Sequence, residues 1–100
     1  MPRLTRSEIE GLFADRIMVL DGAMGTSIQQ RDLSAADYGG EEYEGCTDYV
    51  SVTKPGVIEG IHAEYLAAGA DIIETNTFGA TATVLGEYGL QDEVATVNLA

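Results

Sequence analysis

The sequence predicts an α/β fold: the first βαβα portion of a (β/α)8 TIM-type barrel, truncated after its second strand–helix unit. Four consecutive apolar residues at 17–20 end at Asp21, as a buried strand ends at a polar corner. A second apolar core at 72–73 runs into a polar corner that ends at Gly79. A helix-patterned segment at 53–69 lies between them, and strand, helix and strand in this order form a right-handed βαβ unit.

Two parallel strands with their helices are too few to bury apolar strands on both faces, as parallel sheets require. A (β/α)8 barrel takes about 250 residues, so the 100 residues of this chain are interpreted as the N-terminal part of such a barrel domain. The expected strands, residues 17–20 and 72–75, are adjacent and parallel. A dinucleotide-binding sheet is disfavoured because Gly22 and Gly25 lack the G-x-G-x-x-G spacing.

The first helix is expected at residues 6–15, before the first strand. Thr5 and Glu8 have the spacing of a capping box, in which each side chain bonds the backbone N–H of the other residue. Apolar side chains, Ile9 and Leu12 among them, then follow at helical intervals. We assign no chemistry to this helix.

The helix between the strands has two start signals. These are the hydroxyl of Thr53 as a cap and Pro55 in the first turn, where its missing N–H costs nothing. Apolar residues such as Ile58 lie on one face, and Gly69 marks the C-terminal end. His62 borders that face, and it either makes a local hydrogen bond or serves as a ligand or catalytic group.

Two further helices are expected after the second strand. The first spans residues 79–88 and is stopped by Gly89. Asp92 has the position of a cap for the second helix, in which Val94 and Val97 share one face.

Residues 27–52 have the least regular pattern, with a helical turn expected at 27–31. The segment 32–48 is rich in acids and contains no base. A loop longer than about 15 residues in a compact domain is usually functional or disordered, and the tyrosines here favour packing. The segment is either a solvated surface excursion or a lid or rim near the site. Its Cys46 has no Cys or His at metal-ligand spacing and is interpreted as a free thiol.

The charge of the chain excludes several classes of function. Asp and Glu number 17 against 5 Lys and Arg, the net charge is −12, and no Lys or Arg follows Lys54. The chain therefore has few basic side chains with which to bind nucleic-acid phosphates, which argues against a nucleic-acid-binding protein. The sequence also lacks the Gly-Lys-Ser/Thr of a P-loop. No apolar run approaches the ~20 residues that span a bilayer, no signal peptide is visible, and a single cysteine suits a reducing compartment. We expect a cytoplasmic protein without nucleic-acid or membrane partners.

Two segments together resemble the opening of the homocysteine S-methyltransferase family: residues 20–26 (Leu-Asp-Gly-Ala-Met-Gly-Thr) and residues 68–80 (Ala-Gly-Ala-Asp-Ile-Ile-Glu-Thr-Asn-Thr-Phe-Gly-Ala). The acidic segment 32–48, called the acidic insert below, is followed by Thr-Lys-Pro at 53–55. Together they are similar to the cobalamin-dependent branch of that family. The resemblance covers about residues 12–100. It implies a homocysteine-binding (β/α)8 barrel that transfers a methyl group to the homocysteine thiol, giving methionine. The implied donor is methylcobalamin, which methyltetrahydrofolate recharges in a separate domain.

The resemblance also implies two cofactors, zinc and cobalamin, in the full-length enzyme. The family's zinc ligands are three cysteines from late barrel strands; none of them is in this chain, and Cys46 matches none. No catalytic residue and no metal ligand are therefore assigned here, and the chain alone is expected to bind no cofactor and to be inactive. The implied partners are homocysteine and the folate- and cobalamin-binding domains of the same protein.

The expected substrate-binding residues are Asp21, Thr75, Phe78 and Gly79. Asp21 is suited to accept hydrogen bonds from the substrate ammonium, although Asp before Gly is also a common turn residue. Thr75 offers a hydroxyl, and N–H groups around Phe78 and Gly79, at a helix N-terminus, suit a carboxylate. The neighbouring Asn76 and Thr77 either join them or satisfy the backbone of their own corner.

Alternatives remain open from the residues. The methyl donor is S-methylmethionine or betaine in place of methylcobalamin, or the chain is a catalytically inert fragment or binding module. In a third alternative it is an unrelated α/β binding protein that uses Asp21 for another amine. Three late cysteines in the native gene would identify the family.

Overall fold

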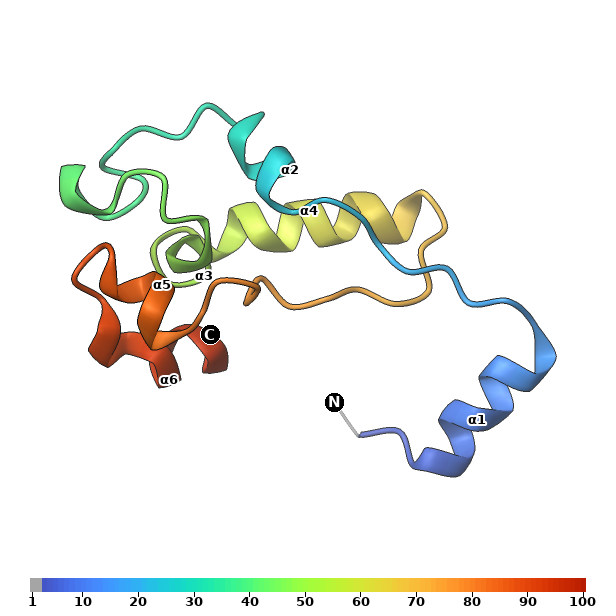
Figure 1. The fold of residues 1–100 in the computed structure, drawn as a ribbon. Helices are drawn as coiled ribbons and strands as arrows, with labels where there is room; N and C mark the ends of the chain where they lie inside the picture. Colours follow the sequence, from blue (N-terminus) through green and yellow to red (C-terminus); the bar gives the residue numbers. More distant parts are fainter. Residues whose placement is uncertain (1–2) are drawn as a thin grey trace.

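The computed structural model describes residues 3–100, which are mostly helical (Figure 1). Short 3-10 helices, labelled η, join several of the α-helices. In chain order the elements are α1 (Arg6–Asp15), α2 (Gly25–Gln29), η1 (Glu41–Tyr43), η2 (Thr47–Tyr49), α3 (Val50–Thr53), α4 (Pro55–Ala67), α5 (Ala82–Gly86), η3 (Gln91–Glu93) and α6 (Val94–Leu99).

The predicted βαβα portion of a (β/α)8 barrel is wrong for this structure. Within residues 3–100, β pairing is limited to one isolated parallel bridge between Leu20 and Ile72. The N–H of Asp21 donates to the carbonyl of Ile72 at 2.9 Å, and the N–H of Ile72 donates to that of Val19 at 3.1 Å. The two expected strands therefore approach in the parallel direction at one point, but they do not form a sheet.

Incomplete burial is the physical reason for this difference. Strands of a parallel sheet are stabilised by apolar side chains that are covered on both faces. Here Ile17 is 89% exposed, and Val19 and Leu20 are each 51% exposed. The apolar run that predicted a buried strand is an extended, largely open segment.

The helix predicted between the two segments is confirmed as α4, with Pro55 as its first residue. Gly69 follows its C-terminal end with a φ of +113°, a left-handed conformation that glycine adopts without strain. The predicted Thr53 cap is wrong, because Thr53 is the last residue of α3 and its hydroxyl donates to the carbonyl of Tyr49 at 3.4 Å. The hydroxyl of Thr53 thus bonds back to the residue that precedes α3 and does not cap α4.

The predicted first helix is confirmed as α1, with both bonds of the capping box. Thr5 Oγ1 accepts the N–H of Glu8 at 3.2 Å, and the N–H of Thr5 donates to Glu8 Oε2 at 2.7 Å. No residue of α1 is buried, and the helix projects from the rest of the chain (Figure 1). Arg16 attaches this end of the chain to the body through a two-pronged ion pair with Asp71, whose Oδ2 also accepts the N–H of Val19 at 2.9 Å.

Two clusters of buried side chains form the core, and residues of the acidic insert enter both. The first joins α2, the insert, α3 and α4 through Ile28, Tyr38, Val50, Ile58 and Ile61. The second joins the insert to α5 and α6 through Cys46, Ala80, Leu85, Leu90 and Val97. The expectation that the tyrosines pack is confirmed, since Tyr38 is buried and the rings of Tyr43 and Tyr49 lie 5.3 Å apart.

The C-terminal helices are shorter than predicted. The helix expected at 79–88 is limited to α5, which begins after Thr81, whose hydroxyl accepts the N–H of Val84 at 3.3 Å. Asp92 lies inside η3 and does not cap α6. None of the helices in residues 3–100 combines the length and the apolar character needed to cross a membrane.

Candidate functional site

A cavity of about 480 Å³ lies where the corner at residues 21–25 meets the corner at residues 75–79. All four residues expected to bind substrate line it. The full lining is Asp21, Gly22, Met24, Gly25, Thr47, Asp48, Glu74, Thr75, Asn76, Thr77, Phe78, Gly79 and Val84. Three separate stretches of the sequence thus meet at one site.

Asp21 connects the two corners. Its Oδ2 accepts the N–H of Glu74 at 3.1 Å, and its own N–H donates to the carbonyl of Ile72. Within residues 3–100 its second carboxylate oxygen, Oδ1, accepts no hydrogen bond from another residue. The half-buried carboxylate is therefore oriented by the backbone and keeps one oxygen available to a ligand.

The first corner is braced by α4. The phenolic hydroxyl of Tyr65 donates to the carbonyl of Ala23 at 3.1 Å. A Cβ added to Gly22 would lie 3.1 Å from that hydroxyl oxygen, so the ring packs closely against the glycine. The turn after Asp21 is thus supported from one side by a side chain of the helix that links the two corners.

The second corner carries a hydroxyl pair and an open aromatic ring. The hydroxyl oxygens of Thr75 and Thr77 lie 2.7 Å apart, so each can act as donor or acceptor to the other. Phe78 is fully exposed, at 104% of its reference surface, although it lines the cavity. The ring is an uncovered apolar edge of the site.

The N–H of Gly79 is already occupied by a side chain of the protein. It donates to Asp48 Oδ1 at 3.0 Å, in a buried hydrogen bond. The expected position at a helix N-terminus is also wrong, because α5 begins at Ala82. The N–H of Phe78 makes no hydrogen bond within residues 3–100, so of the two predicted carboxylate donors it is the one left free.

Sequence reasoning missed Asp48, and it left the role of Asn76 undecided. Asn76 is 8% exposed, and its amide nitrogen donates to the carbonyl of Thr47 at 2.7 Å and to Ser51 Oγ at 3.2 Å. Asp48 is also 8% exposed. Both contacts join the corner to the acidic insert, which is therefore a wall of the cavity, as one of the two sequence-based alternatives proposed. An acid beside aromatic residues was the only local signal for Asp48.

The cavity lining carries three acids, Asp21, Asp48 and Glu74, and no Lys, Arg or His. A concave surface lined by one sign of charge concentrates the opposite charge in a ligand. The arrangement favours a ligand with a cationic group, such as a primary ammonium.

The described residues do not fit a zinc site. Within residues 3–100 no group of three or more His, Cys, Asp or Glu side chains is arranged to hold a metal ion. Cys46 is buried in the second core cluster, and burial raises the pKa of its thiol.

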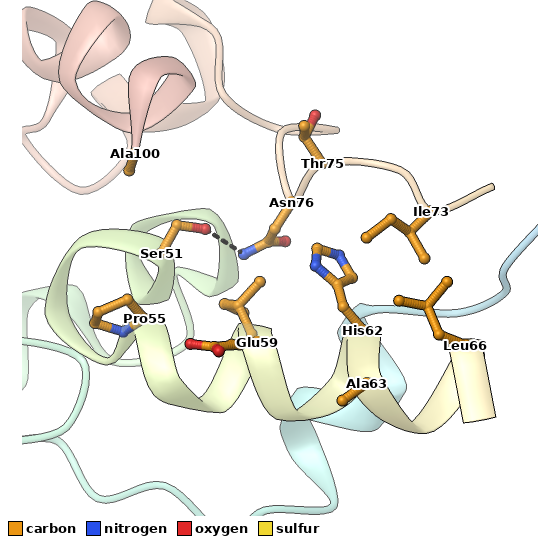
Figure 2. A pocket seen from close by; sticks show the side chains of 11 residues that line it. Ser51, Pro55, Glu59, His62, Ala63, Leu66, Ile73, Thr75, Asn76 and Ala100 are labelled. Carbon is orange, nitrogen blue, oxygen red and sulfur yellow. Dashed lines mark hydrogen bonds between the residues drawn. The ribbon is translucent and has the colours of Figure 1, made fainter. Parts of the chain in front are cut away.

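A second cavity, of about 490 Å³, lies between α4 and the segment 73–76 (Figure 2). Its lining is largely apolar, from residues such as Leu66 and Ile73, and the His62 ring projects from α4 toward the segment 73–76. His62 Nε2 lies 3.0 Å from the carbonyl oxygen of Glu74. His62 thus contacts the backbone of a segment 12 residues further along the chain, and both possibilities for its role stay predictions.

Comparison with known proteins agrees with the resemblance found in the sequence. The sequence model of the family described as homocysteine S-methyltransferase matches residues 18–100. A methionine synthase of Mycobacterium leprae (strain TN) is 47% identical over 81 residues, which cover 81% of this chain and 7% of that protein. A methionine synthase of Mycobacterium tuberculosis (strain ATCC 25618 / H37Rv) is 43% identical over 88 residues, 88% of this chain and 7% of that protein. The chain thus spans only a small part of the length of these relatives, and it belongs to the homocysteine S-methyltransferase family.

Proposed function

We propose that this chain binds the amino-acid end of homocysteine in a protein that transfers a methyl group to the homocysteine thiol and forms methionine. The family match and the names of the two relatives support methyl transfer to homocysteine. The cavity at the two corners is the proposed site. In this proposal Asp21, Thr75, Phe78 and Gly79 line the part of the site that recognises the substrate.

The observation that carries the proposal is the free oxygen of Asp21 in a cavity that contains acids and no base. A carboxylate with one oxygen held by the N–H of Glu74 is already oriented before the ligand arrives. Its other oxygen can then accept a charge-assisted hydrogen bond from the substrate ammonium. The N–H of Phe78 is available to the substrate carboxylate, and the exposed ring lies beside it.

The methyl donor and the cofactors are the finer part of the proposal. We infer methylcobalamin, recharged from methyltetrahydrofolate, as the donor, because the acidic insert and the Thr-Lys-Pro at 53–55 resemble the cobalamin-dependent branch of the family. Zinc and cobalamin, as well as the folate- and cobalamin-binding domains, would be supplied by parts of a longer protein. Residues 3–100 provide the binding and orientation of the amino acid, in a cytoplasmic setting.

The substitution Asp21→Asn tests the proposal, because it keeps the side-chain shape and removes the charge. Charge-assisted hydrogen bonds contribute about 1.5–3 kcal/mol, so we expect homocysteine affinity to fall by about 10- to 150-fold. Isothermal titration of the full chain with homocysteine measures this change. The loss should be much smaller with 4-mercaptobutanoate, which has the same thiol and carboxylate but no amino group.

The matched control is Asp92→Asn, which removes the same charge at an exposed position outside the cavity. It should leave the affinity for both thiols unchanged. If Asp21→Asn weakens both thiols equally, Asp21 supports only its turn, and the proposed ammonium contact is wrong.

A further inference from the structure

Asp48 is a buried acid that the proposed substrate contacts do not use. It lies in η2, in the acidic insert, and its side chain is covered by the corner at residues 75–79. Its carboxylate is 31 residues away in the sequence from the N–H that it accepts. A buried carboxylate that bonds a backbone N–H across such a separation fixes the relative position of two segments.

The packing of Gly79 shows how close this contact is. A Cβ added to Gly79 would lie 2.6 Å from Asp48 Oδ2, which is closer than real Cβ atoms approach other atoms. The carboxylate therefore lies directly against the glycine, with Oδ1 on its N–H and Oδ2 beside the position that a Cβ would take. Only glycine leaves room for this arrangement.

A second bond holds the same two segments together. Three residues before Gly79, the buried amide of Asn76 donates to the carbonyl of Thr47 and to Ser51 Oγ. Figure 2 shows the bond between Asn76 and Ser51. The corner is thus attached to the insert at both of its ends, and Phe78 lies between the two attachments.

We propose that Asp48 is a positioning residue of the ligand site: by holding the N–H of Gly79, it fixes the corner at residues 75–79 and directs the substrate carboxylate to the N–H of Phe78. This inference rests on the proposed function. The N–H of Gly79 cannot serve Asp48 and the substrate at once.

The test compares Asp48→Ala with Asp48→Asn in the full chain. The alanine leaves a buried N–H without a partner, whereas the asparagine keeps a side-chain oxygen that can accept it. If the corner is correctly formed in only a fraction of the molecules, the apparent affinity falls in proportion to that fraction. We expect Asp48→Ala to weaken homocysteine binding by about tenfold and Asp48→Asn to restore most of the affinity. Titration calorimetry measures the affinity, and amide hydrogen exchange at Gly79 reports the state of the corner.

A control and a second ligand separate positioning from general loss of structure. Asp37→Ala removes a similar bond in the same insert, in which Asp37 Oδ2 accepts the N–H of Ser34 at 2.9 Å, but Asp37 does not line the cavity. It should change neither homocysteine affinity nor exchange at Gly79. The ligand 3-aminopropanethiol lacks the carboxylate, so its affinity should fall much less than that of homocysteine in Asp48→Ala.

The outcomes distinguish this inference from the function on which it rests. If the unmodified chain does not bind homocysteine, both the proposed function and the role of Asp48 are wrong. If the unmodified chain binds homocysteine and Asp48→Ala binds it equally well, only the role of Asp48 is wrong. An equal loss for homocysteine and 3-aminopropanethiol, without rescue by Asp48→Asn, would also overturn the positioning role.

Discussion

The two corners of the cavity differ in how they are held. The corner at residues 21–25 is supported by α4, through one exposed hydrogen bond from Tyr65 to the carbonyl of Ala23. The corner at residues 75–79 is attached to the insert by the buried side chains of Asp48 and Asn76. The first corner presents the acid that we expect to bind the ammonium, and the second presents a fixed backbone.

The packing around Gly22 and Gly79 also differs between the two corners. A Cβ on Gly22 would meet the far end of a tyrosine side chain, which can move by a few tenths of an ångström. A Cβ on Gly79 would meet a buried carboxylate and the side chain of Val84, at 2.6 and 3.1 Å. The first corner therefore has a neighbour that can shift slightly, whereas the second is packed against side chains that leave no room for a Cβ.

The largest expected effect is that of Gly79→Ala compared with Gly22→Ala. Overpacking a filled site costs about 1–3 kcal/mol, so Gly79→Ala should lower the free energy of unfolding by that amount. Gly22→Ala should cost less than about 1 kcal/mol, because the tyrosine ring can shift. Urea unfolding followed by circular dichroism measures both.

A double variant identifies the source of the cost at Gly79. If the clash is with Asp48, the combination of Gly79→Ala and Asp48→Ala should be less destabilising than the two single effects added together. Additive effects would mean that the two residues are not coupled, and the described difference between the corners would not hold.

The next effect is the loss of each corner's hydrogen bond. Asp48→Ala leaves the buried N–H of Gly79 without a partner, which costs about 1–3 kcal/mol. Tyr65→Phe removes an exposed neutral hydrogen bond and should cost no more than about 0.5–1.5 kcal/mol. Unfolding free energies of the two variants give the comparison, and a larger loss for Tyr65→Phe would reverse it.

The smallest expected effect is the loss of the ion pair between Arg16 and Asp71 at low pH, in the segment before the first corner. The hydrogen bond from Arg16, together with the N–H of Val19, holds the pKa of Asp71 below its ordinary value of 3.8. Because the folded pKa is lowered, the stabilisation is present above pH 3.8 and is lost as the pH falls through the folded pKa. The NMR shift of the Val19 amide should follow this titration and remain flat in Asp71→Asn. A titration at or above the ordinary pKa would contradict the ion pair.

Local signals in the sequence predicted the helices best. The capping box of α1 involves residues three apart, and α4 has Pro55 at its start and Gly69 after its end. Such signals act within one or two turns of the chain, so they operate without the rest of the fold. The sequence also indicated both corners, and the four residues expected to bind substrate line one cavity.

The strands could not be predicted in the same way. Whether an apolar run such as 17–20 becomes a strand depends on partners on either side and on cover for both faces. In this structure it meets residues 71–72 at one bridge and leaves Ile17 and Val19 exposed. Hydropathy records the need for burial, but the tertiary structure decides whether the burial occurs.

The sequence by itself determined the charge of the chain, the ends of its main helices and the residue types at the two corners. Only the tertiary structure decided which donors remain free, because Asp48 reaches the N–H of Gly79 across 31 residues and leaves that of Phe78 open. A buried hydrogen bond between distant segments depends on how both segments pack. No local pattern in either of them records it, and this is why the sequence left the insert as either a surface excursion or a rim of the site, and only the folded chain decided between the two.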